Sequence, residues 1–79
     1  MNGLRVYTKL NGASAAGQKV FYSRRGNGPY YRWFYEENNN EWRAARVVSV
    51  DFTPHNLSMA TWKAVPVALQ TRLGEHYLD

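Results

Sequence analysis

The sequence predicts an α+β protein in which an antiparallel β-meander of three to four strands packs against one C-terminal helix. Residues 19–52 alternate large apolar or aromatic side chains with polar ones, which is the period of a β-strand. Two runs of turn-forming residues, 25–29 and 38–40, divide this region into three strands. Further along the chain, apolar residues recur at spacings of three and four, which is the period of an amphipathic helix.

The segment 4–9 also alternates, with Leu4, Val6 and Thr8 on one side, and is expected to form the first strand. Residues 11–17 follow. They contain two glycines and no large side chain, which is typical of a plain connecting loop. They lack the glycine and lysine spacing of a phosphate-binding loop. The sequence leaves open whether residues 1–17 cover one face of the sheet.

The strands of the middle hairpin can be aligned from their turn. If residues 27–28 are the central pair of a type I′ turn, residues whose numbers add to 55 face each other. This register places Phe21 opposite Phe34 and Lys19 opposite Glu36, an aromatic pair and an ion pair. Such cross-strand pairs contribute about 0.2–1 kcal/mol each, so they favour this register.

The second turn is expected to be a four-residue loop at 37–40 that pairs Glu36 with Arg43. A two-residue alternative would place Glu36 opposite Glu41, where like charges repel. Both alternatives leave the same residues on each face of the third strand, because they differ by an even number of positions.

This register sorts the side chains onto two faces of the sheet. The face that is richer in rings and aliphatic side chains is expected to be the core side. It carries Val20, Tyr22, Tyr31, Trp33, Tyr35, Trp42, Ala44, Val48, Val50 and Phe52, with Arg24 and Arg46 toward one end. The second face mixes rings with charges. It carries Lys19, Phe21, Ser23, Tyr30, Arg32, Phe34, Glu36, Arg43, Ala45, Val47, Ser49 and Asp51.

A helix from about 62 to 77 is expected to cover the core side. Pro66 suits the first helical position, where a missing N–H costs nothing. Leu69 and Leu73 belong to a one-sided apolar stripe. Residues 53–56 are expected to form a turn, while Leu57 to Thr61 could be a strand, a loop or the first turn of a helix.

Composition narrows the class of protein. The 79 residues make one small domain, 1–79, whose core supplies little net stability, so association with a partner or a second copy would supplement it. The absence of cysteine excludes disulfides and thiolate metal sites and fits a cytoplasmic location. No apolar run approaches the roughly 18 residues that a membrane span needs. The net charge of +4 favours anionic partners.

Few residues suggest catalysis. His55 and His76 are about twenty residues apart with no carboxylate at a metal-ligand spacing, so no metal site is expected. Glu36, Glu37 and Glu41 crowd a loop tip, which is wet rather than a desolvated cleft. We therefore expect no enzyme and no cofactor. A small basic ribonuclease that uses Arg, Tyr and His remains an alternative.

The second face is the expected binding surface, and three interpretations of it stay open. The chain itself could bury its rings, or a protein partner or second copy could dock there, which is the favoured function. The third is single-stranded DNA or RNA, whose bases would stack on the rings while Lys and Arg contact the phosphates. The candidate binding residues are Lys19, Phe21, Tyr30, Arg32, Phe34 and Arg43 on the second face, with Arg24 and Arg25 on the adjoining hairpin. The order of strands and helix is similar to that of Whirly-type and PUR-type single-strand binders, in architecture alone.

Overall fold

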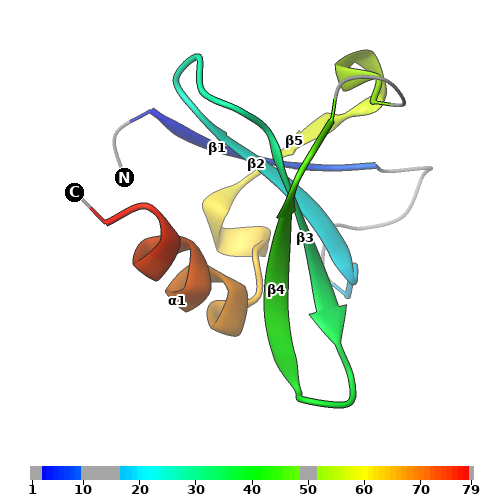
Figure 1. Cartoon of the computed structure of the whole chain (residues 1–79), viewed down its shortest axis with the longest axis vertical. Helices are drawn as coiled ribbons and strands as arrows, with labels where there is room; N and C mark the ends of the chain where they lie inside the picture. Colours follow the sequence, from blue (N-terminus) through cyan, green and yellow to red (C-terminus); the bar gives the residue numbers. More distant parts are fainter. Residues whose placement is uncertain (1–2, 10–16, 49–51, 79) are drawn as a thin grey trace.

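The computed structural model of the chain describes residues 3–9, 17–48 and 52–78 (Figure 1). A five-stranded antiparallel sheet has the strand order β4-β3-β2-β1-β5. The strands are β1 (Leu4–Thr8), β2 (Val20–Arg25), β3 (Tyr31–Glu36), β4 (Glu41–Arg46) and β5 (Ser58–Ala60). Two short 3-10 helices, η2 (Pro54–Asn56) and η3 (Trp62–Ala64), precede the α-helix α1 (Val67–His76). The predicted α+β class, an antiparallel sheet with one C-terminal helix, is confirmed.

The fifth strand comes from the segment that the sequence left open. β5 pairs with β1, and Met59 lies opposite Tyr7. β1 itself lies beside β2 in the sheet, so this part of the N-terminal region extends the sheet rather than covering it. The third strand of the meander ends at Arg46, earlier than the alternation to Phe52 suggests, and Ser49, Val50 and Asp51 fall outside the described residues.

The helix begins later than predicted. Residues 62–64 form a separate 3-10 turn, and Val65 is extended, with φ −77° and ψ 132°. A residue that precedes proline avoids the helical region, so Pro66 separates the two turns. The carbonyl of Pro66 then accepts a hydrogen bond from the Gln70 N–H at 2.9 Å and starts α1.

The predicted register of the middle hairpin is wrong by one residue. Phe21 lies opposite Trp33 rather than Phe34. In the turn, the Gly28 N–H donates to the Arg25 carbonyl at 3.0 Å, and Gly26 has φ +56°. Asn27 is not in the positive-φ region that a type I′ turn requires at both central residues. This one-residue difference turns β2 over relative to β3.

The second hairpin keeps its predicted four-residue loop, 37–40, but not its predicted pairing. Glu36 lies opposite Glu41 instead of Arg43. The guanidinium of Arg43 offsets the like-charge contact, since Nη1 lies 3.0 Å from a Glu36 oxygen and 3.8 Å from a Glu41 oxygen. The faces of β4 follow those of β3 as predicted, because this shift is even.

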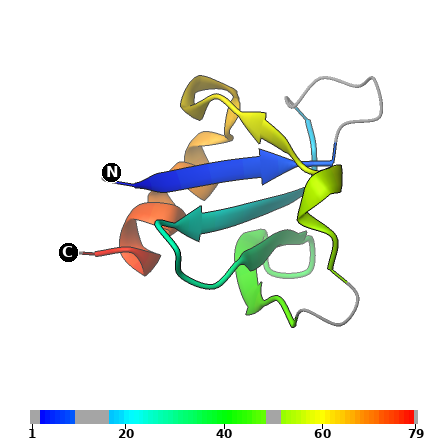
Figure 2. The same ribbon diagram turned by 90° about the horizontal axis from the view of Figure 1, so that it is seen from above.

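The core lies between α1 and one side of the sheet, which Figures 1 and 2 show from two directions. Its buried apolar residues are Val6, Phe21, Trp33, Trp42, Val65, Leu69 and Leu73. Trp33 is the largest fully buried side chain, and its indole N–H donates to the Ser23 hydroxyl at 2.8 Å. That hydroxyl also bonds Tyr77, just beyond α1, at 2.9 Å. Within the described ranges, no helix has the length and apolarity to cross a membrane.

Candidate functional site

The side of the sheet away from α1 carries most of the candidate residues, and we call it the open face. Residues that pair directly across antiparallel strands point to the same side. Arg5 pairs with Arg24, and Tyr7 pairs with Tyr22 and Met59, so all five lie on one face. The same rule adds Val20, Arg32, Phe34, Glu36, Glu41, Arg43 and Ala45 from the neighbouring strands.

Five of the eight predicted binding residues gather on the open face or at its end beside the β2–β3 hairpin. These are Arg24, Tyr30, Arg32, Phe34 and Arg43. Arg24 was predicted at one end of the core side, and the shifted register of β2 moves it to the open face.

The other three predicted residues lie on the α1 side. Phe21 is 0% exposed and belongs to the core, so its predicted place on the second face was wrong. Lys19 pairs with Glu37 at 3.0 Å and lies over the ring of Tyr35 at 4.9 Å. Arg25 lies opposite Leu4, a residue that packs against the core. The one-residue shift of β2 explains why Lys19 and Phe21 are not on the face that was predicted for them.

A cluster of rings that sequence reasoning did not predict covers part of the open face. Phe52 packs on Tyr22 and Tyr30 with centroid distances of 5.4 and 4.9 Å, and Tyr7 lies 6.1 Å from Tyr30. Tyr22 is therefore only 6% exposed. Tyr22 and Phe52 were assigned to the core side. The strand periodicity of residues 4–9 puts Tyr7 on the side opposite Val6, so pairing β1 with β2 would have predicted Tyr7 beside Tyr22.

Three cations of the open face lie over its rings. Lys9 is 5.6 Å from the Tyr22 centroid, and Arg24 is 4.8 Å from that of Tyr30. Arg24 is also held by its Nε, which donates to the Gly28 carbonyl at 2.8 Å. The guanidinium of Arg32 lies 5.7 Å from the ring of Phe34. Such contacts orient the cationic groups and leave their charge uncompensated.

The acids of the open face are confined to one end. Glu36 and Glu41 sit at the β3–β4 hairpin, where both pair with Arg43. Within residues 3–9, 17–48 and 52–78, no carboxylate forms a salt bridge with the other cations of this face. These cations are Arg5, Lys9, Arg24 and Arg32. Among the described residues, this face therefore presents four positive charges that no carboxylate pairs with, and they are interleaved with rings.

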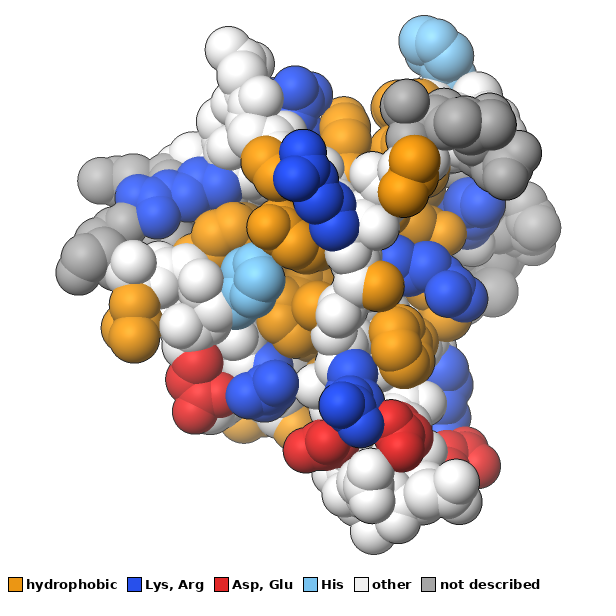
Figure 3. All heavy atoms as spheres, in the orientation of Figure 1, with side chains coloured by type: hydrophobic (Ala, Val, Ile, Leu, Met, Phe, Trp, Pro, Cys, Tyr) orange, Lys and Arg blue, Asp and Glu red, His pale blue; other side chains and the backbone are white. Residues whose placement is uncertain are grey.

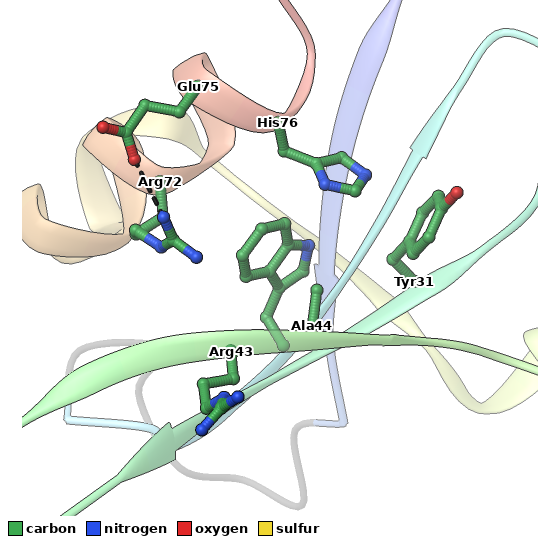
Figure 4. A pocket seen from close by; sticks show the side chains of 7 residues that line it. Tyr31, Arg43, Ala44, Arg72, Glu75 and His76 are labelled. Atoms are coloured by element: carbon green, nitrogen blue, oxygen red, sulfur yellow. Dashed lines mark hydrogen bonds and ion pairs between the residues drawn. The ribbon is translucent and has the colours of Figure 1, made fainter. Parts of the chain in front are cut away.

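A second feature is a cleft of about 370 Å³ between α1 and β4. Figure 3 shows hydrophobic side chains that reach the surface between these elements. The imidazole of His76 lies beside Tyr31, as Figure 4 shows, with ring centroids 4.5 Å apart. It also makes an edge contact with the ring of Trp33, with centroids 5.3 Å apart. Burial, and then the charge of Arg72, lower the pKa of His76 below its usual value. The Arg72 guanidinium pairs with Glu75 at 3.0 Å.

We also searched the described residues for side chains that could hold a metal ion together. In the part of the chain that the structure describes, no three His, Cys, Asp or Glu side chains come together as metal ligands. His76 faces rings and an arginine, and its neighbour Glu75 is engaged by that arginine. No family model, curated protein or solved structure matches this chain.

Proposed function

We propose that this protein binds single-stranded nucleic acid through its open face. One observation supports it above the others. In the described part of the chain, four cations without carboxylate partners alternate in space with rings on one side of an antiparallel sheet. Phosphates would follow the cations, and unpaired bases would stack on the rings at about 1–3 kcal/mol per base. The affinity would then come from charge and stacking together.

Phe34 is the main stacking residue in this proposal. Tyr22 is buried beneath Phe52, and Tyr30 packs against the same ring, so both offer little free surface. Phe34 is half-buried in the middle of β3, and the Arg32 guanidinium lies over its ring at 5.7 Å from the centroid. A base stacked on Phe34 would bring its phosphate toward Arg32.

Arg24 and Arg5 extend the cationic track across β2 and β1. They lie directly opposite each other in the sheet, on the same side as Arg32. Arg24 is held by the Gly28 carbonyl and, at 3.4 Å from Nη1, by the Tyr30 hydroxyl. An already ordered guanidinium loses less conformational entropy when it contacts a phosphate.

Self-association through this same face is disfavoured by its charge. A two-fold axis would set one cationic face against another, and like charges across an interface cost several kcal/mol. Phe21, one of the rings predicted on the docking face, is in the core. Docking on an acidic protein surface would use the same cations, and the experiment below distinguishes it. The cytoplasmic location expected from the absence of cysteine stays a prediction.

The test is a fluorescence-anisotropy titration with a labelled oligonucleotide of mixed sequence, as single strand and as duplex. Four phosphate contacts give a slope of log affinity against log salt of about −3, which is roughly a 50-fold loss between 50 and 200 mM salt. The single strand should bind more tightly than the duplex because only its bases are free to stack.

Two variants with a matched control locate the site. Arg32→Gln should reduce the salt slope by about 0.7, and Phe34→Ala should weaken binding about tenfold or more with an unchanged slope. Lys19→Gln removes a cation that is 63% exposed on the α1 side and should change little. Equal effects of Arg32→Gln and Lys19→Gln, or binding independent of salt, would refute the use of this face. No binding of either oligonucleotide at 50 mM salt would refute nucleic acid as the partner and leave the acidic protein surface as the alternative.

A further inference from the structure

The outer edge of β4 presents backbone groups that the sheet does not use. β4 is the terminal strand, and the Val47 N–H donates to the Tyr30 carbonyl at 2.9 Å in line with the β3–β4 register. Hydrogen-bonded pairs alternate along an antiparallel ladder, so Trp42, Ala44 and Arg46 direct their N–H and C=O groups outward. Of these outward groups, the Trp42 carbonyl accepts a hydrogen bond from Arg72 Nε at 3.1 Å.

This edge lacks several of the devices that keep sheet edges from pairing. β4 has six residues, an uninterrupted register with β3 and no proline. Ala44 and Ala45 are small and exposed, so a second backbone can approach closely. The opposite edge differs, because β5 has only three residues and lies between two 3-10 helices. An edge of the β4 kind is a template for strand addition.

We propose that the occupant of this edge is a second copy of the chain, with the two β4 strands antiparallel and Ala44 opposite Ala44. The outward residues then pair with each other, Trp42 with Arg46 and Ala44 with itself, and supply six interchain hydrogen bonds by this pattern. Arg43 faces Ala45, so no like charges are opposed. The smallest side chains of the strand lie at the two-fold axis.

Neighbouring registers fit less well. Centring the pair on Arg43 would set Arg43 against Arg43, a like-charge contact. Centring it on Ala45 would place Trp42 opposite Val48, which lies beyond the end of the strand. The arginine Arg72 does not prevent pairing, because the Trp42 carbonyl has two lone pairs and can accept from Arg72 and from Arg46 of the second copy.

The proposed pairing also covers the cleft beside β4. Ala44 lines this cleft, and Arg72 and Glu75 stand at its border, as Figure 4 shows. A two-fold axis perpendicular to the sheet puts both helices on one side and both open faces on the other. The dimer would therefore have one continuous sheet and a cationic face of double length. The interface uses none of the four cations Arg5, Lys9, Arg24 and Arg32, so it does not depend on nucleic-acid binding.

Disulfide trapping tests the register, since the natural chain contains no cysteine. In the proposed pair the two Ala44 Cα atoms would be about 5.5 Å apart, within the disulfide range. Ala44→Cys should therefore form a covalent dimer at micromolar concentration on mild oxidation, read on a non-reducing gel. Ala45→Cys, one residue away on the open face, is the matched control and should cross-link at least tenfold more slowly.

Light scattering of the unmodified protein over a concentration series is the second measurement, and a mass of two chains is expected. Ala44→Pro removes the outward N–H and leaves the ladder with β3 intact, so it should give a monomer with an unchanged circular dichroism spectrum. A monomer at all concentrations up to about 1 mM, or a dimer that persists in Ala44→Pro, would overturn the proposal. So would equal cross-linking of the two cysteine variants.

Discussion

Replacing Ser23 with alanine should destabilise the protein far more than the loss of one small side chain suggests. Ser23 is fully buried on β2 and accepts the indole N–H of Trp33, which is itself only 1% exposed. Alanine leaves that donor without a partner in the core. A buried unsatisfied donor costs about 1–3 kcal/mol, so we expect a loss of about 2 kcal/mol in the free energy of unfolding.

The assay is thermal and urea denaturation followed by circular dichroism. For a chain of this size, about 2 kcal/mol corresponds to a fall in Tm of roughly 8–16 °C. Tyr77→Phe is the matched control, because it removes the other hydroxyl bonded to Ser23 while the Trp33 bond stays in place. Because Tyr77 is only half-buried, Tyr77→Phe should lower the free energy of unfolding by less than about 1 kcal/mol.

A second reading comes from the phenol of Tyr77. Burial raises its pKa above the usual value, and the hydrogen bond with Ser23 acts in the opposite direction. Ser23→Ala should therefore raise the pKa of Tyr77 further, which an ultraviolet titration would detect. A stability change below about 0.5 kcal/mol, or one equal to that of Tyr77→Phe, would refute the view that Ser23 satisfies the buried indole.

Three further predictions use the same methods. Phe21→Ala should lower the free energy of unfolding by about 3–5 kcal/mol because it leaves a cavity in the core, and Phe34→Ala should lower it clearly less. Similar losses in the two variants would contradict the placement of Phe21 in the core and Phe34 on the open face. Thr8→Val should stabilise the fold by about 1 kcal/mol, since the fully buried Thr8 hydroxyl has no hydrogen-bond partner within the described residues; a loss would show that it has one. The pKa of His76 is lowered in the folded state, so protonation of this imidazole disfavours folding. Its contribution to the free energy of unfolding is therefore complete above pH 6.5 and is lost progressively as the pH falls below that value. His76→Gln should flatten that decline in a series of melts from pH 7.5 to 5, and an unchanged slope would count against it.

Local sequence patterns were sufficient for strands β1 to β4 and for α1, but they left the segment of β5 open. The alternation in 19–52 and the two turn-forming runs predict β2, β3 and β4, and the spacing of Leu69 and Leu73 predicts α1. These patterns work because a strand or a helix repeats its side-chain directions over a few residues. Pro66 delays the start of α1 by a purely local steric effect, so the late start was also accessible from the sequence.

The candidate site was predictable only in part. Four of the candidate residues lie on β3 and β4 or directly before β3: Tyr30, Arg32, Phe34 and Arg43. The predicted pairing of these strands is wrong by two residues, and an error of two leaves each side chain on its predicted face. The predicted face of Phe21 is wrong, because the register of the first hairpin depends on which residue of its turn adopts a positive φ. Gly26 adopts it, and every side chain of β2 exchanges faces as a result.

Composition and periodicity thus specify strands that carry both rings and cations, followed by one helix that can cover only one face of their sheet. They do not specify which rings the helix covers, because a strand with aromatic residues on both faces can be buried on either. Contacts distant in sequence make that choice: Leu69 and Leu73 bury Phe21 with Trp33, and β1 brings Arg5 beside Arg24. A single residue in a turn separates the two outcomes, and only the packed structure distinguishes between them.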